Sequence, residues 1–185
     1  GTESVPLTVE TTTNIVLLPK VPMTPRFADR RVGFFTTPHI YFNDKQQAVE
    51  TRDFVHRWRL EPKPEDIEKY KRGELVEPAK PIVFYIDPAT PAQWREEIKA
   101  GVFDWQEAFE AAGFKNAVVA KDAPTDDPDF DIDDARYSVI TYAASQQANA
   151  MGPSVVDPRS GEIIQADILW YHNVVRLLQE WRFIQ

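Results

Sequence analysis

The sequence predicts an α/β (α+β) fold: a twisted mixed sheet backed by a long helix, with a small antiparallel β lobe at the N-terminus. The first observation is the unbroken apolar run Ile82–Ile86, rich in β-branched and aromatic residues, which is typical of a strand covered on both faces. The second is a long helical pattern after it. The third is the short apolar segment Ala117–Ala120. Strand, helix and strand in this order predict a right-handed crossover and a parallel pair.

The helical pattern predicts one continuous helix of about six turns between Pro91 and Gly113. Thr90 suits its N-cap, Pro91 its first position and Gln93 a capping box, while Gly113 suits a left-handed C-cap. Apolar residues recur at steps of three and four, and we expect this stripe to be buried against the central strand. Its members are Trp94, Ile98, Val102, Trp105, Phe109 and Ala112.

Three parts follow one another along the chain. Residues 1–60 read as a β-rich lobe, residues 61–80 as a linker rich in proline and charge, and residues 81–185 as the main α/β unit. The linker contains a predicted short helix at Pro64–Lys71, closed by Gly73.

Further elements are predicted on either side of the linker. In the lobe we expect strands within Leu7–Leu18, Arg31–Phe42 and Phe54–Leu60. In the main unit we expect a strand at Tyr137–Tyr142, a hairpin joining Val155-Val156 to Ile163-Ile164 through a turn closed by Gly161, a strand ending at Tyr171, and a helix from Asn173.

Composition bounds the function. The 185 residues are 43% hydrophobic and 12% aromatic, enough for a sizeable core, and the formal charge of −8 argues against nucleic acid as a partner. There is no cysteine, which excludes disulfides, thiol catalysis and cysteine-bound zinc within this chain. No run of eighteen apolar residues predicts a transmembrane segment, and no signal peptide is visible.

The sequence alone shows no complete catalytic set. His39, His56 and His172 stand in different predicted elements and none has a partner at the spacing of a helical metal site. No P-loop, GxGxxG or GxSxG is present. Glu96 and Glu97 lie on the outer face of the predicted helix, where their expected role is solvation.

The loop Asp122–Asp134 holds seven aspartates. Oxygen-rich loops can bind calcium when carboxylates converge, although this spacing does not match an EF-hand. The two interpretations are a solvated acidic loop and a calcium site.

Read as a whole, the chain from about Val21 to Gln185 resembles the amino-terminal half of a metzincin zinc metallopeptidase catalytic domain. It resembles in particular a bacterial group of large, multidomain zinc-dependent metalloproteases. The residues that carry the likeness are PMTPRFADRRVGFF and RWRLEP upstream, then WREEIKAGVFDWQEAFEAAGF, YSVITY and AMGPSVVDPRSGEIIQADILW.

The resemblance implies the upper part of a catalytic domain, truncated before the zinc-binding helix. The family holds its zinc, and the glutamate that acts as general base, in HExxHxxGxxH, which has no match in this chain. No catalytic residue and no metal ligand is therefore assigned here, and the chain alone is expected to be inactive and to bind no zinc. The implied cofactor of the full-length protein is zinc. Its implied partners are a peptide or protein substrate and the remaining half of the catalytic domain, in a secreted, periplasmic or cell-surface setting.

The same resemblance assigns a substrate-binding edge strand, which in the family pairs antiparallel with an extended substrate. The matching residues are Asn149, Ala150, Met151, Gly152, Pro153, Ser154 and Val155. Gly152 and Pro153 offer little side chain or ladder capacity, which suits an edge. The alternative is an ordinary hairpin strand.

Two other functional hypotheses stay open. The chain could be a non-catalytic binding or regulatory module on the same scaffold. Alternatively, the segment Met23–Phe35 could lie across the cleft as a prosegment does, with Asp29 as a candidate carboxylate in place of a cysteine.

Overall fold

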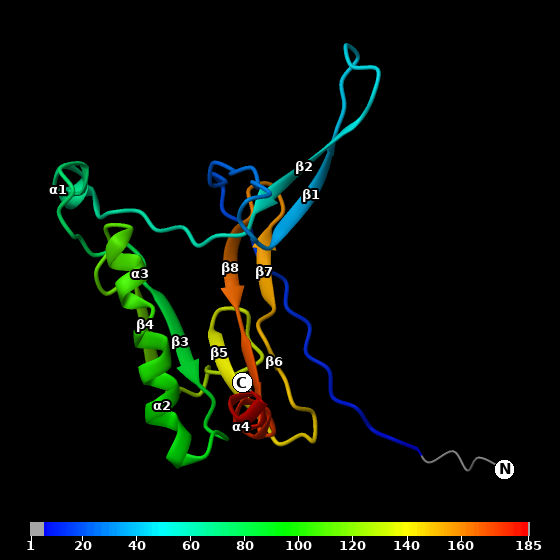
Figure 1. Ribbon diagram of the computed structural model, residues 1–185, viewed down its shortest axis with the longest axis vertical. Helices are drawn as coiled ribbons and strands as arrows, with labels where there is room; N and C mark the ends of the chain where they lie inside the picture. Colours follow the sequence, from blue (N-terminus) through cyan, green and yellow to red (C-terminus); the bar gives the residue numbers. More distant parts are fainter. Residues whose placement is uncertain (1–5, 185) are drawn as a thin grey trace.

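The computed structural model describes residues 6–184 and is organised around a five-stranded sheet in the order β4-β3-β5-β9-β6 (Figure 1). The strands are β3 (Ile82–Ile86), β4 (Val118–Asp122), β5 (Ser138–Ala143), β9 (Ile168–Tyr171) and β6 (Ala150–Met151). β3, β4, β5 and β9 pair in parallel, and β6 pairs antiparallel with β9. The mixed sheet with its helices confirms the α/β (α+β) class.

Two small antiparallel sheets complete the β structure. One is the hairpin of β1 (Thr36–Tyr41) and β2 (Glu50–Val55), which projects from the body in Figure 1. The other is the hairpin of β7 (Ser154–Asp157) and β8 (Glu162–Ala166). The predicted turn at Gly161 is confirmed, since Gly161 has a φ of 73° and its N–H donates to the Asp157 carbonyl.

The backing helix is interrupted, which corrects the prediction of one continuous helix. α2 (Ala92–Phe103) has Asp104 as its C-cap, and α3 (Gln106–Ala111) begins after Trp105. At the start of α3, the Gln106 side chain donates to the Val118 carbonyl (2.6 Å) and accepts from the Ala117 N–H (3.3 Å), next to the start of β4. This contact turns Gln106 toward the sheet.

The start and end of this helical region differ in how well they were predicted. α2 begins at Ala92 after Pro91 and has no side-chain cap, so the prediction of a Thr90 N-cap with a Gln93 capping box is wrong. Thr90 is instead buried, at 1% exposure. The predicted left-handed Gly113 is confirmed, with a φ of 94°.

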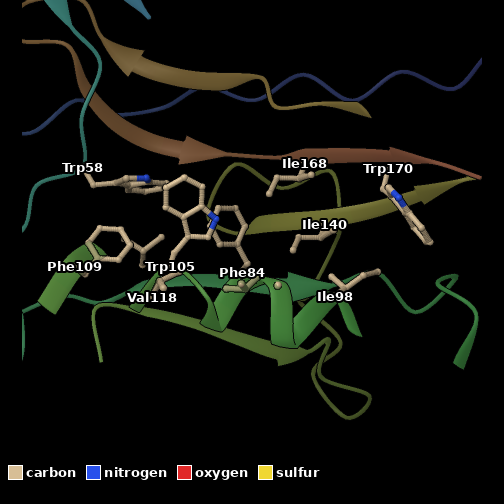
Figure 2. A pocket seen from close by; sticks show the side chains of 12 residues that line it. Trp58, Phe84, Ile98, Trp105, Phe109, Val118, Ile140, Ile168 and Trp170 are labelled. Atoms are coloured by element: carbon tan, nitrogen blue, oxygen red, sulfur yellow. The ribbon is translucent and has the colours of Figure 1, made fainter. Parts of the chain in front are cut away.

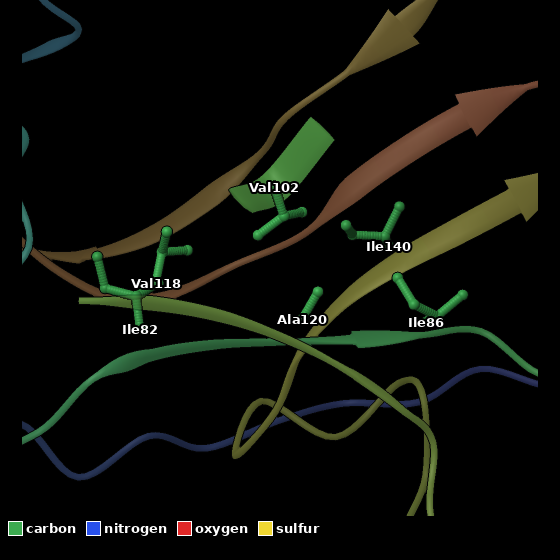
Figure 3. Close-up of a cluster of buried hydrophobic side chains, with 6 residues drawn as sticks. All are labelled: Ile82, Ile86, Val102, Val118, Ala120 and Ile140. Atoms are coloured by element: carbon green, nitrogen blue, oxygen red, sulfur yellow. The ribbon is translucent and has the colours of Figure 1, made fainter. Parts of the chain in front are cut away.

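The main core lies between α2 and one face of the sheet (Figure 3). Its buried members come from β3, β4, β5 and α2, and each large side chain contributes roughly 1.5–3 kcal/mol by burial. They are Ile82, Ile86, Val102, Val118, Ala120 and Ile140. Trp94, Ile98 and Phe109 of the predicted stripe are only partly buried.

The N-terminal lobe contains less strand than expected. Leu7–Leu18 forms no strand; it is extended and mostly exposed, because among residues 6–184 no strand edge pairs with it. The predicted strand segment Arg31–Phe42 contains β1. The predicted segment Phe54–Leu60 overlaps β2 only at Phe54 and Val55.

The remaining helices match their predictions. The linker carries a short 3-10 turn, η1 (Pro64–Asp66), and α1 (Ile67–Lys71), followed by Gly73 with a φ of 83°. The chain closes with α4 (Val174–Ile184). Within residues 6–184 no helix is long and apolar enough to cross a membrane.

Candidate functional site

The predicted edge stretch lies at the margin of the five-stranded sheet. Ala150 and Met151 form β6, opposite Trp170 and Leu169 of β9. The stretch then breaks at Gly152 and Pro153 and continues as β7, which pairs with β8. All seven predicted residues, Asn149, Ala150, Met151, Gly152, Pro153, Ser154 and Val155, are exposed.

Among the described residues, the backbone-to-backbone hydrogen bonds of residues 149–153 are all made on the side that faces β9. The Asn149 carbonyl accepts from the Tyr171 N–H (3.4 Å), and the Pro153 carbonyl accepts from the Asp167 N–H (2.9 Å). Because alternate residues of an antiparallel strand face opposite ways, Ala150 and Gly152 direct their backbone groups outward. Among the described residues no strand covers this outer edge. The Ala150 N–H is capped locally by the Asn149 Oδ1 (2.8 Å).

The second feature is an open apolar cavity of about 540 Å³ between α2, α3 and the sheet (Figure 2). Apolar side chains from the helices, from alternate positions of the strands and from the segment before the linker line it. The lining residues are Trp58, Ile82, Phe84, Ile98, Gly101, Val102, Trp105, Phe109, Val118, Ile140, Ile168 and Trp170. A cavity of this size and composition fits an apolar occupant.

Trp105 lies at this cavity and is not part of the buried core. It is 65% exposed, and Figure 2 shows its ring over the cavity. The expectation that Trp105 is buried against the strand Ile82–Ile86 is therefore wrong: Trp105 lies on the same side as Ile82 and Phe84, but the cavity between them is open.

The three histidines are separate from one another. The His39 Nε2 contacts the Pro158 carbonyl (2.6 Å), the His56 Nε2 contacts the Thr37 hydroxyl (2.8 Å), and the His172 Nδ1 contacts the Tyr142 hydroxyl (2.6 Å). Burial lowers the pKa of His56. Tyr142 lies near the carboxyl end of β5, and His172 comes directly after the carboxyl end of β9. The Tyr142 ring also lies 5.4 Å from the Trp170 ring, between centroids.

The aspartates of the loop Asp122–Asp134 make local contacts. Asp127, Asp131 and Asp134 each accept a backbone N–H from two residues further on. Arg136 donates to the Asp134 carboxylate and lowers its pKa. Asp122 pairs with Lys99 (2.7 Å). These contacts are typical of turns, and nowhere in residues 6–184 do three His, Asp or Glu side chains form a set of metal ligands.

The segment Met23–Phe35 packs on the N-terminal hairpin. Its backbone bonds join Arg26 to Val55 and Ala28 to Asp53, and Asp29 is held by Arg31 (2.6 Å). The segment therefore lies against β2, which is in a different sheet from β6.

The part of the cavity wall that comes from strands was not predicted. Ile168 and Trp170 alternate on β9, as Ile82 and Phe84 do on β3, so each pair faces the same side of the sheet. This alternation was a usable signal. Trp58 was not predictable in this way, because its contact with Phe84, at 6.3 Å between ring centroids, crosses the linker.

Comparison with known proteins gives one match. Residues 1–63 match the family model described as a domain of unknown function (DUF5117). No curated protein and no solved structure matches the chain.

Proposed function

We propose that residues 81–184 are the scaffold and substrate-binding part of a zinc metallopeptidase catalytic domain of the metzincin type. The observation that carries the proposal is β6, an antiparallel strand at the margin of an otherwise parallel sheet, with one edge free among the described residues. The resemblance implies such a sheet, a backing helix and an edge strand that binds substrate.

In this proposal an extended peptide pairs with the free edge of β6. The backbone groups of Ala150 and Gly152 face outward and can exchange hydrogen bonds with a peptide main chain. The Ala150 N–H exchanges its bond with the Asn149 side chain for one with a substrate carbonyl. Met151 and Val155 are 47% and 39% exposed and offer apolar contacts to substrate side chains.

The chemical step lies outside these residues. Zinc, when bound by the remaining half of the domain, supplies a water activated for attack on the peptide carbonyl. The part described here orients the peptide and holds it extended.

The apolar cavity is the proposed contact for that remaining half. Twelve apolar or glycine residues line about 540 Å³ of open space on the same sheet that carries β6. Exposed apolar surface of this kind is typical of a surface that another structural element covers. Trp58, Trp105 and Trp170 line it, and all three are expected to lose exposure when the second half is present.

The test compares the 185-residue chain with the same polypeptide extended to include an HExxH segment. We expect zinc binding and peptide cleavage only in the extended protein. In that protein Ala150→Pro removes an outward N–H without removing a β6–β9 bond, so it should raise KM for peptides. Ala150→Ser keeps this N–H and serves as the matched control.

Two outcomes would contradict the proposal. Stoichiometric zinc in the 185-residue chain would place the metal site elsewhere. An extended protein that binds zinc and peptide but cleaves nothing would favour the non-catalytic binding module.

A further inference from the structure

Three arginines hold the N-terminal arm, defined here as residues 14–25, by its backbone. The Arg159 Nη2 donates to the Pro19 carbonyl (2.8 Å), the Arg59 Nη2 donates to the Val21 carbonyl (3.0 Å), and Arg57 donates to the Thr24 carbonyl. The arm is part of the dark blue segment that runs past the β7–β8 hairpin in Figure 1. Arg57, Arg59 and Arg159 are called the arginine groove below.

Two of these arginines are also held by buried carboxylates. Arg59 makes two hydrogen bonds to the carboxylate of Glu162, and Arg159 makes a similar pair to Asp157. Both carboxylates are buried, at 6% and 0% exposure. Bidentate pairs of this kind fix the plane of the guanidinium group, so its remaining donors point in a set direction.

Arg57 has capacity that the arm does not use. Its Nε is buried and has no partner among the described residues. Burial, followed by the nearby charge of Arg26, lowers the pKa of Arg57. The Arg57 Nη2 is the donor that reaches the arm, so each of the three arginines gives one donor to a main-chain carbonyl, which fits a ligand read by its main chain.

The groove contacts very little of the arm's side chains. Ile15 and Leu17 are 97% and 95% exposed, and Val21 is also exposed. Met23 is the one buried residue of the arm. Recognition therefore rests mainly on main-chain carbonyls and on the buried Met23, with smaller contributions from the half-buried Val16, Leu18, Pro19 and Pro25.

From these contacts we infer that the arginine groove is a binding site for an extended peptide segment, and that residues 19–24 are its intramolecular ligand. The ligand it fits has an extended main chain with an apolar residue at the position of Met23. The site is distinct from β6, and it does not depend on the proposed peptidase function. The arm also makes a second attachment, since Asn14 exchanges two hydrogen bonds with the backbone of Asp133 and Ala135.

The experiment measures binding of a fluorescein-labelled peptide of residues 14–25, NIVLLPKVPMTP, to the full chain by fluorescence polarisation. In the unmodified chain the tethered arm competes, so apparent affinity is low. Met23→Asp and Asn14→Ala in the chain should free the groove and tighten peptide binding, by about tenfold for Met23→Asp. Asn14 is exposed, so that variant tests the groove without disturbing the core.

Loss of the groove is tested in the Met23→Asp background. Arg159→Gln should abolish peptide binding, and the double change Asp157→Asn with Arg159→Gln should abolish it too, although it leaves no unpaired buried charge. Arg176→Gln is the matched control, because Arg176 pairs only with Glu180 on α4 among the described residues. Circular dichroism of each variant separates loss of the site from loss of the fold.

A second peptide tests whether the arginine groove recognises the main chain of its ligand and not the exposed side chains. Replacing Ile15, Leu17 and Val21 of the peptide with serine should leave its affinity within about twofold, because these side chains face solvent in the arm. The inference is overturned if the peptide fails to bind the folded Asn14→Ala and Met23→Asp chains. It is also overturned if Arg159→Gln binds as well as its parent, or if the serine peptide loses binding.

Discussion

Arg59 holds the buried carboxylate of Glu162 through two hydrogen bonds, from Nε to Oε1 at 2.8 Å and from Nη2 to Oε2 at 2.6 Å. The pair joins the end of the N-terminal lobe to β8. Arg59→Ala would leave Glu162 buried without its partner, and we expect a loss of about 3 kcal/mol in the free energy of unfolding. Urea titration measures this loss.

The matched control for that prediction is Arg72→Ala. Arg72 pairs with Glu74 at 2.7 Å, and both side chains are more than half exposed. Solvent screens such a pair, so its removal should cost less than about 1 kcal/mol. Equal losses for both variants would show that the burial of Glu162 does not matter.

Acid should destabilise the protein through Asp157. Hydrogen bonds from Arg159 lower the pKa of Asp157 in the folded protein, while the unfolded chain keeps the usual value of about 3.9. The stabilisation is therefore complete above about pH 4 and is lost as pH falls through the folded value. Unfolding free energies between pH 7 and pH 3 should fall more steeply for the unmodified chain than for Asp157→Asn.

Gly161 should tolerate no side chain. Its φ is positive, and an added Cβ would lie 2.3 Å from the Val55 carbonyl oxygen. Gly161→Ala should cost more than about 2 kcal/mol by thermal or urea unfolding. Gly73→Ala is the control, since Gly73 also has a positive φ but has open space around it, and it should cost about 1 kcal/mol. A smaller loss at position 161 than at 73 would contradict the close approach to Val55.

Trp105 should contribute little to the stability of this chain. Because the side chain is 65% exposed, Trp105→Ala should cost less than about 1 kcal/mol. Ile140→Ala, at a residue 4% exposed in the same region, should cost about 2–5 kcal/mol. Similar losses in denaturant titrations of the two variants would mean that Trp105 is buried in solution.

Local signals in the sequence predicted most of the regular structure. The helix end at Gly113 and the turn at Gly161 were predictable because a positive φ is costly for residues other than glycine. Ile82–Ile86 was readable because a covered strand needs a continuous apolar run. The Leu7–Leu18 strand failed because β-propensity describes a residue's fit to a sheet and supplies no partner strand.

The site was less predictable for a related reason. A periodic stripe shows which face of a helix is apolar but not whether that face is covered, so Trp105 was assigned to the core although it lies at an open cavity. The arginine groove joins residues up to 140 positions apart, Pro19 and Arg159, and no local pattern signals such a contact.

The bonds between positions 57 and 161–163 also set an order of events during synthesis. The Arg57 N–H donates to the Gly161 carbonyl (3.0 Å), and the Ile163 N–H donates to the Arg57 carbonyl (2.9 Å). The end of the first third of the chain must therefore wait for the last third to leave the ribosome, roughly 5–20 s later at ordinary elongation rates. Through that interval the β1–β2 hairpin can pair within the first third, but its attachment to the β7–β8 hairpin cannot yet form.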